Sequence, residues 1–196
     1  AAVAIGKHNF LVTHIARRVA EELDNALVYP INPYAPAGDP VKVTGEMKSP
    51  GTTSLSEETF AAVSRAMAYS AIAAGFKHVA LMGDHYGGQD SLRKIASELD
   101  ADWLSKGVRV FYVPVYDEGE GQMKEHLARL NVPPERRTPV DDVSEVMAID
   151  TDNRWVRKDQ IPPEDARVAS AELGRIFIEN KIRSAVASIR KQVGAP

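Results

Sequence analysis

Residues 77–89 read KHVALMGDHYGGQ, and this stretch decides the fold. Its apolar run, residues 78–82, has the length of a buried strand. A polar, glycine-rich turn follows at once and leads into a helical pattern. Open α/β sheets bind ligands at the carboxyl ends of their parallel strands. The turn from Gly83 to Gln89 therefore marks both a strand end and a candidate site.

The rest of the chain alternates short apolar runs with helical patterns. Two more strands are predicted at 26–31 and 108–113. Helices are predicted at 9–24, 57–74, 92–106, 120–130, 144–149 and 164–192. This alternation predicts a single α/β domain over residues 1–196, a three-layer α/β/α sandwich with a mostly parallel central sheet.

Three segments are expected to lack regular structure. Residues 32–54 are rich in proline and glycine, and a loop of that length in a compact domain is usually functional. Asp117, Glu118 and Glu120 are expected to form a solvated acidic loop. Prolines at 133, 134 and 139 are expected to break the chain before the short helix at 144–149.

Composition narrows the class of protein. The chain has 196 residues, 44% hydrophobic and 26% charged, with a formal net charge of −3 and no cysteine. Disulfides, thiolate zinc sites and a cysteine nucleophile are thereby excluded, and neither a nucleic acid nor a membrane is expected as partner. The cytoplasm is the default compartment. A removed N-terminal signal would make the protein periplasmic or secreted.

Several side chains can carry chemistry, each with a structural alternative. Asp84 and His85 can bind a metal, polarise a substrate or move a proton, or they can be a helix cap beside a packed histidine. His8 is either a site residue or a cap beside Asn9, with Lys7 as its solvent-facing neighbour. Asp142 is either a site residue or, with Ser144, a helix cap. The remaining histidines are expected to be structural: His14, His78 and His126.

Five segments carry a resemblance to a known family. Residues 49–59 (SPGTTSLSEET) resemble the F-P-G-T-x-S-L-x-x-E-T segment of the creatininase (creatinine amidohydrolase) family. The other matches are residues 6–9 (GKHN), 75–78 (GFKH), 83–89 (GDHYGGQ) and 142–144 (DVS). They occur in the family's order and span roughly residues 5–150.

The resemblance implies a metal-dependent hydrolase that opens a cyclic amide or a related C–N bond of a small molecule. It also implies a three-layer α/β/α fold and a homo-oligomer, usually a hexamer. The cofactor would be a divalent metal, Zn or Mn, at about one ion per chain. The residues implied are His8, His85 and Asp84 as metal ligands, Asp142, Glu46 and Arg137 as catalytic groups, and Tyr86, Gly87 and Gly88 around the substrate.

The chain also departs from the family pattern. Gly87 stands where creatininase itself has an acid that binds a second metal, and Arg137 stands where the family has a catalytic histidine. Glu46 stands where a histidine is common. The family's N-terminal strand and its E-x-H-G metal motif would precede Gly6, but residues 1–5 (AAVAI) cannot bind a metal, so the motif either lies outside this sequence or is lost. These departures favour a single-metal site that uses His8 and His85, with a third ligand from Asp84, Glu46 or upstream residues.

Three functions therefore stay open from sequence. The first is the metal-dependent amidohydrolase. The second is a catalytically degenerate protein of the same fold that binds a small molecule or a partner without hydrolysis. The third is an α/β enzyme of another class that uses Asp84 and His85 directly as acid and base.

Overall fold

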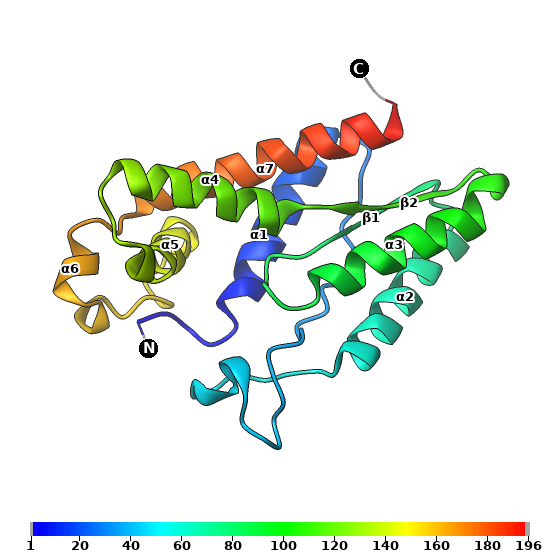
Figure 1. Cartoon of the computed structure of the whole chain (residues 1–196). Coiled ribbons are helices and arrows are strands. Elements are labelled where there is room, and N and C mark those ends of the chain that lie inside the picture. Colours follow the sequence, from blue (N-terminus) through cyan, green and yellow to red (C-terminus); the bar gives the residue numbers. More distant parts are fainter. Residues whose placement is uncertain (1, 195–196) are drawn as a thin grey trace. The chain divides into compact units, whose positions relative to one another are not determined.

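The computed structural model describes residues 2–194 and divides the chain into two compact units (Figure 1). One unit comprises the residues up to Tyr29 together with Val115–Val186, and the other comprises Pro30–Pro114 and the chain from Ala187 onward. Each unit has its own packing and its own candidate residues. That the two together form a single domain stays a prediction.

The second unit is built around a parallel pair of strands. β1 (His78–Met82) pairs with β2 (Arg109–Val113), His78 opposite Arg109 and Met82 opposite Val113. α3 (Gln89–Trp103) and the short 3₁₀ turn η2 (Leu104–Lys106) connect them, and α3 contacts both strands (Figure 1). The two strands and their parallel pairing confirm the sequence prediction.

The helix that precedes β1 begins and ends as its sequence predicts. In α2 (Glu57–Ala73), the Ser56 hydroxyl caps the first turn by accepting the Thr59 N–H. Gly75, with φ of 97°, follows the helix in the left-handed region that favours glycine. Since α2 contacts both α3 and β1, these local signals place it against the strand pair.

The predicted strand at 26–31 does not form. These residues have no strand pairing, and the Leu27 side chain is 75% exposed. Pro30 and Pro33 lack the N–H groups that a sheet ladder needs, so this apolar run cannot pair as an inner strand. The sheet within residues 2–194 thus has two strands, and the three-layer sandwich stays a prediction.

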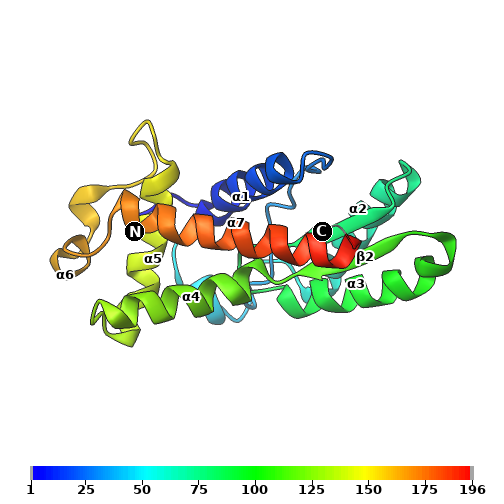
Figure 2. The same ribbon diagram turned by 90° about the horizontal axis from the view of Figure 1, so that it is seen from above.

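The first unit is helical. It contains α1 (Lys7–Leu23), α4 (Val115–Arg129), α5 (Pro134–Ile149), α6 (Pro163–Ala166) and most of α7 (Ala171–Val193). Figure 2 shows α4 running alongside α7, where Gln122 hydrogen-bonds Ser184 at 3.1 Å. None of the helices described in residues 2–194 is long and apolar enough to cross a membrane.

Three helix predictions in this unit need correction. Asp117, Glu118 and Glu120 lie in α4 rather than in a loop, the first two in its first turn, because carboxylates suit the positive end of a helix. α5 begins at Pro134 and keeps Pro139 inside it, because burial of Val140 outweighs the proline's poor propensity. The helix predicted at 164–192 is divided into α6 and α7.

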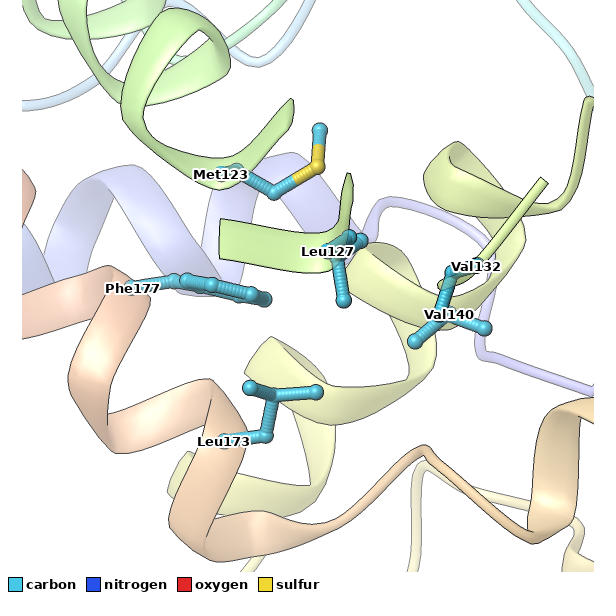
Figure 3. Packing of buried hydrophobic residues seen from close by; sticks show 6 residues of the cluster. All are labelled: Met123, Leu127, Val132, Val140, Leu173 and Phe177. Carbon is cyan, nitrogen blue, oxygen red and sulfur yellow. The ribbon is translucent and has the colours of Figure 1, made fainter. Parts of the chain in front are cut away.

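An apolar cluster joins three helices of the first unit (Figure 3). Its side chains come from α4, from α5 and the turn before it, and from α7: Met123, Leu127, Val132, Val140, Leu173 and Phe177. All are buried, and a buried aliphatic or aromatic side chain contributes roughly 1.5–3 kcal/mol relative to an exposed one. The cluster therefore accounts for the packing of α5 against α4 and α7.

A buried ion pair also fastens α5 to α7. The Lys181 ammonium lies 2.8 Å from the Glu145 carboxylate, and the two residues are 6% and 2% exposed. Attraction between the two charges inside the protein offsets the cost of removing them from water. Truncating one side chain would leave the charge of the other buried and unpaired. The pair therefore fixes which faces of α5 and α7 meet.

Asp150 organises the segment that follows α5. Its carboxylate accepts hydrogen bonds from the backbone N–H groups of Arg154 (2.7 Å), Trp155 (2.9 Å) and Val156 (3.1 Å). Val156 forms an antiparallel bridge with Val3, and the Trp155 ring stacks on Phe10 of α1 with centroids 4.3 Å apart. One carboxylate thus shapes the segment against which the start of the chain packs.

These hydrogen bonds predict a pH-dependent stability. Burial alone raises the pKa of Asp150, but the three N–H donors together outweigh it and hold the pKa below its ordinary value. A carboxyl with a lowered folded-state pKa stabilises the fold above its unfolded pKa, near 4, and that stability is lost as the pH falls through the folded pKa. Asp150→Asn should lower the free energy of unfolding at pH 7 by about 1–3 kcal/mol.

The measurement is urea denaturation of wild type and variant across a pH series. The difference between them should narrow below about pH 4, where wild type also loses the carboxylate. Asp152→Asn, at an exposed position in the same turn, should match wild type at every pH. A constant difference for Asp150→Asn down to the lowest pH would contradict the prediction.

Candidate functional site

The turn between β1 and α3 holds the main candidate residues. It begins at Gly83, directly after β1, and ends at Gly88, the N-cap of α3, with φ of 88°. Asp84 is 3% exposed, His85 is half-buried and Tyr86 is 79% exposed. The turn therefore lies at the carboxyl end of a parallel strand, as predicted, with a buried carboxylate next to a histidine and an outward tyrosine.

The His85 ring is held by the turn itself. The Gly87 backbone N–H donates to His85 Nδ1 at 3.0 Å. A backbone amide can only donate, so Nδ1 accepts and carries no proton, and the neutral ring carries its proton on Nε2. The turn therefore sets both the direction and the tautomer of this imidazole.

Gly87 and Gly88 leave no room for side chains. A Cβ at Gly87 would lie 1.7 Å from the Pro36 carbonyl oxygen, and one at Gly88 would lie 2.6 Å from the Phe60 ring. The turn is thus pressed against the long loop on one side and α2 on the other. An acid cannot occupy position 87 unless the loop moves, so this turn has no place for a second-metal ligand there.

The predicted functional loop folds on itself beside this turn. The Ala37 N–H donates to the Ser54 hydroxyl at 3.0 Å, and the Glu46 N–H donates to the Ala37 carbonyl at 2.9 Å. Glu46 lies in the short 3₁₀ turn η1 (Gly45–Lys48), and its side chain is exposed. The loop reaches the His85 turn through Pro36; the catalytic role predicted for Glu46 stays a prediction.

Asp142 and Lys7 form an ion pair in the first unit. Asp142 lies well inside α5, so the alternative that it caps a helix start is wrong. Lys7 is the first residue of α1, and its side chain is mostly buried against Asp142. The expectation that Lys7 faces solvent is therefore wrong, because its ammonium compensates the charge of a candidate site residue.

The other first-unit candidates lie on the same two helices. His8 is the second residue of α1, and Arg137 lies in the first turns of α5. Arg137 Nε donates to the Val132 carbonyl at 3.1 Å, which fastens the turn before the helix. Asp84, His85 and Glu46 belong to the other unit, so a shared pocket with His8 and Asp142 stays a prediction.

Gln89 and Tyr112, for which the sequence predicts no role, hold the turn in place. Gln89, 7% exposed, donates to the carbonyl oxygens of His85 (2.6 Å) and Gly83 (3.3 Å). Its own side-chain oxygen accepts from the Tyr112 hydroxyl of β2 at 2.7 Å. In the sequence, the signal for such a role of Gln89 was a polar residue at the start of a helix, directly after two glycines.

A metal does not fit the described residues as they stand. Across residues 2–194, no three His, Cys, Asp or Glu side chains come together as a possible metal site. A metal-binding histidine usually donates its second ring nitrogen to an acceptor. His85 Nδ1 instead accepts a hydrogen bond, and binding through Nε2 would then require the loss of the last ring proton.

Comparison with known proteins finds one matching family model and several similar solved structures. A family model described as creatinine amidohydrolase matches residues 2–189. A crystal structure of creatinine amidohydrolase (creatininase) aligns with a TM-score of 0.73 at 19% identity, covering 97% of this chain and 84% of that one. A structure named creatininase Mn aligns with a TM-score of 0.73 at 20% identity, covering 97% and 85%.

A third solved structure, of a mutant creatininase complexed with creatine, gives a TM-score of 0.75 at 19% identity, covering 97% of this chain and 86% of that one. Another similar structure is described as a Zn-Zn type. No curated protein matches the chain. At these identities the solved structures show that the fold is shared, and the match to the family model extends over nearly the whole chain.

The packing around the turn predicts the effect of a single methyl group. Gly87→Ala places a Cβ against the Pro36 carbonyl and should lower the free energy of unfolding by about 1–3 kcal/mol through overpacking. Gly121→Ala is the control, because a Cβ there meets no atom within 4 Å and alanine favours the helix. Thermal and urea denaturation of both variants measure this, and equal stability of the two would contradict it.

Proposed function

Because the chain belongs to the creatininase family, we propose that it hydrolyses a cyclic amide or a related C–N bond of a small molecule. The observation that carries the proposal is the buried Asp84 carboxylate beside His85, at the carboxyl end of a parallel strand. Ligands of open α/β sheets bind at such strand ends. A similar structure is described as a creatininase complexed with creatine, so creatinine belongs on the substrate panel.

Hydrolysis of an amide needs a polarised carbonyl, an activated water and a proton for the leaving nitrogen. His85, with its proton on Nε2, supplies a donor for the carbonyl oxygen or for the leaving nitrogen. Asp84 supplies a carboxylate next to it that can accept a proton from water. We assign Tyr86, which is exposed on the same turn, to contact with a planar ring of the substrate.

A divalent metal is the cofactor that the resemblance implies, and similar structures are described as Mn and Zn-Zn forms. When bound, such an ion would polarise the carbonyl and lower the pKa of water. His8, His85 and Asp84 are the predicted ligands, but the described residues do not gather into a metal-binding group. We therefore derive no step through a metal, and the chemistry proposed rests on Asp84 and His85.

A catalytically degenerate binding protein is the second candidate. The Lys7 ammonium neutralises Asp142, and Arg137 is engaged with a backbone carbonyl. With these contacts, neither Asp142 nor Arg137 is positioned to carry a proton in the reaction. These two contacts favour a small-molecule binder that retains the fold and has lost the reaction.

Replacement of His85 separates the two candidates. His85→Ala should lower kcat/KM about 10²–10⁴-fold if the imidazole donates or accepts a proton. His78→Ala is the matched control. This exposed histidine is the first residue of β1, whereas the His85 turn follows the last residue of the same strand. The assay uses purified full-length protein on a panel of cyclic amides that includes creatinine.

Metal analysis of the same preparations completes the test. If wild type holds about one divalent ion per chain and His85→Ala loses both the ion and the activity, the catalytic group is a metal and not the Asp84–His85 pair alone. Turnover without metal supports the pair acting alone. No turnover on any panel member, with ligand binding retained, would establish the degenerate candidate in place of the hydrolase.

We further propose a homo-oligomer, a hexamer by resemblance to the family. The proposal rests on the resemblance, and the long proline-rich loop at 32–54 suits contact between subunits. Light scattering at micromolar concentration should give about six times the 21.4 kDa chain mass. A monomer at that concentration would contradict the proposal.

A further inference from the structure

Gln89 connects the His85 turn to the neighbouring strand. Its side-chain nitrogen donates to the carbonyl oxygens of Gly83 and His85, and its side-chain oxygen accepts from the Tyr112 hydroxyl. The amide is buried, so each of these bonds is made away from water, where leaving a polar group unmet is costly. One side chain thus binds two backbone carbonyls of the turn, those of Gly83 and His85.

The carbonyl oxygens of Gly83 and His85 decide which way the Gln89 amide points, and the Tyr112 hydroxyl, which can donate or accept, donates to the amide oxygen. The hydroxyl lies 2.7 Å from the amide oxygen, which leaves the amide nitrogen facing the turn. If the amide were reversed, its oxygen would face two carbonyl oxygens, which cannot donate. The Arg93 guanidinium lies over the Tyr112 ring, 4.9 Å from its centroid, and holds that ring in place.

His85 is consequently held at two points. Gln89 fixes its carbonyl oxygen, and the Gly87 N–H fixes its ring through Nδ1. The backbone between these points is the tight turn of residues 85–88. If the carbonyl anchor is lost, the packing against Pro36 and Phe60 remains, but the His85 backbone gains freedom and the imidazole direction is set less narrowly.

We propose that Gln89 and Tyr112 are positioning residues that set the direction of the His85 imidazole for the hydrolysis proposed above. Gln89 acts on His85 through its carbonyl oxygen, and Tyr112 acts on it through Gln89. The inference rests on the proposed function for its kinetic consequence only. The orientation of the ring is a property of the folded protein and can be measured without turnover.

The experiment uses the full chain with Tyr112→Phe and Gln89→Leu. On any panel substrate that wild type turns over, each variant should lower kcat on the order of 100-fold, the effect of a misplaced catalytic group, with KM little changed. Gln122→Leu is the control, because it removes a side-chain hydrogen bond to Ser184 in the other unit and none of the contacts of the turn. It should leave kcat unchanged.

A second readout follows the His85 ring directly. Magnetic resonance of isotope-labelled histidine at about pH 8.5, where ordinary histidines are neutral, distinguishes a bare Nδ1 from a protonated one. The chain has five histidines, and His85→Ala identifies the signal of interest. Wild type should show one ring tautomer, with the proton on Nε2, and both positioning variants should show a mixture.

The outcomes separate the inference from the proposed function. A variant that melts earlier but keeps wild-type kcat and a single His85 tautomer overturns the inference, since Gln89 would then be structural only. If wild type turns over no substrate, the hydrolase proposal fails, and the tautomer measurement still decides the positioning role. Should Gln89→Leu not fold, Tyr112→Phe, which removes one hydroxyl, carries the test.

Discussion

The candidate site depends on the absence of side chains at Gly87 and Gly88. Only bare backbone lets the turn pass between the Pro36 carbonyl and the Phe60 ring. This close passage brings the Gly87 amide within hydrogen-bond distance of the His85 ring and starts α3 at Gln89. Because the turn is fixed from both sides, a histidine on a loop acquires a definite direction and tautomer.

In the first unit, α5 has the corresponding role. It meets α1 through the Lys7–Asp142 pair, α7 through the Glu145–Lys181 pair, and the apolar cluster through Val140. Two of its carboxylates, Asp142 and Glu145, are thus paired with cations that the chain itself supplies. This compensation agrees with the absence of a metal-binding group among residues 2–194.

Family membership and geometry bear on different questions. The match over residues 2–189 places the chain in the creatininase family, and the solved structures show that the fold is shared. The geometry shows a buried carboxylate, Asp84, next in sequence to a histidine, His85, whose ring and carbonyl are both hydrogen-bonded within the second unit. In that unit the Pro36 carbonyl lies so close to Gly87 that position 87 has no room for a side chain.

The sequence by itself determined the elements whose signals are local. The strands at 78–82 and 109–113, the Ser56 cap and the buried stripe of α1 follow from hydrophobic period, cap chemistry and glycine, which act over a few residues. The same local signals gave the wrong answer at 26–31 and around Pro139. There, pairing partners and burial decide, and both depend on distant parts of the chain. The site divides in the same way. Asp84 and His85 could be named from the turn alone, whereas the roles of Lys7, Gln89 and Tyr112 come from contacts between residues far apart in sequence, which only the folded chain brings together.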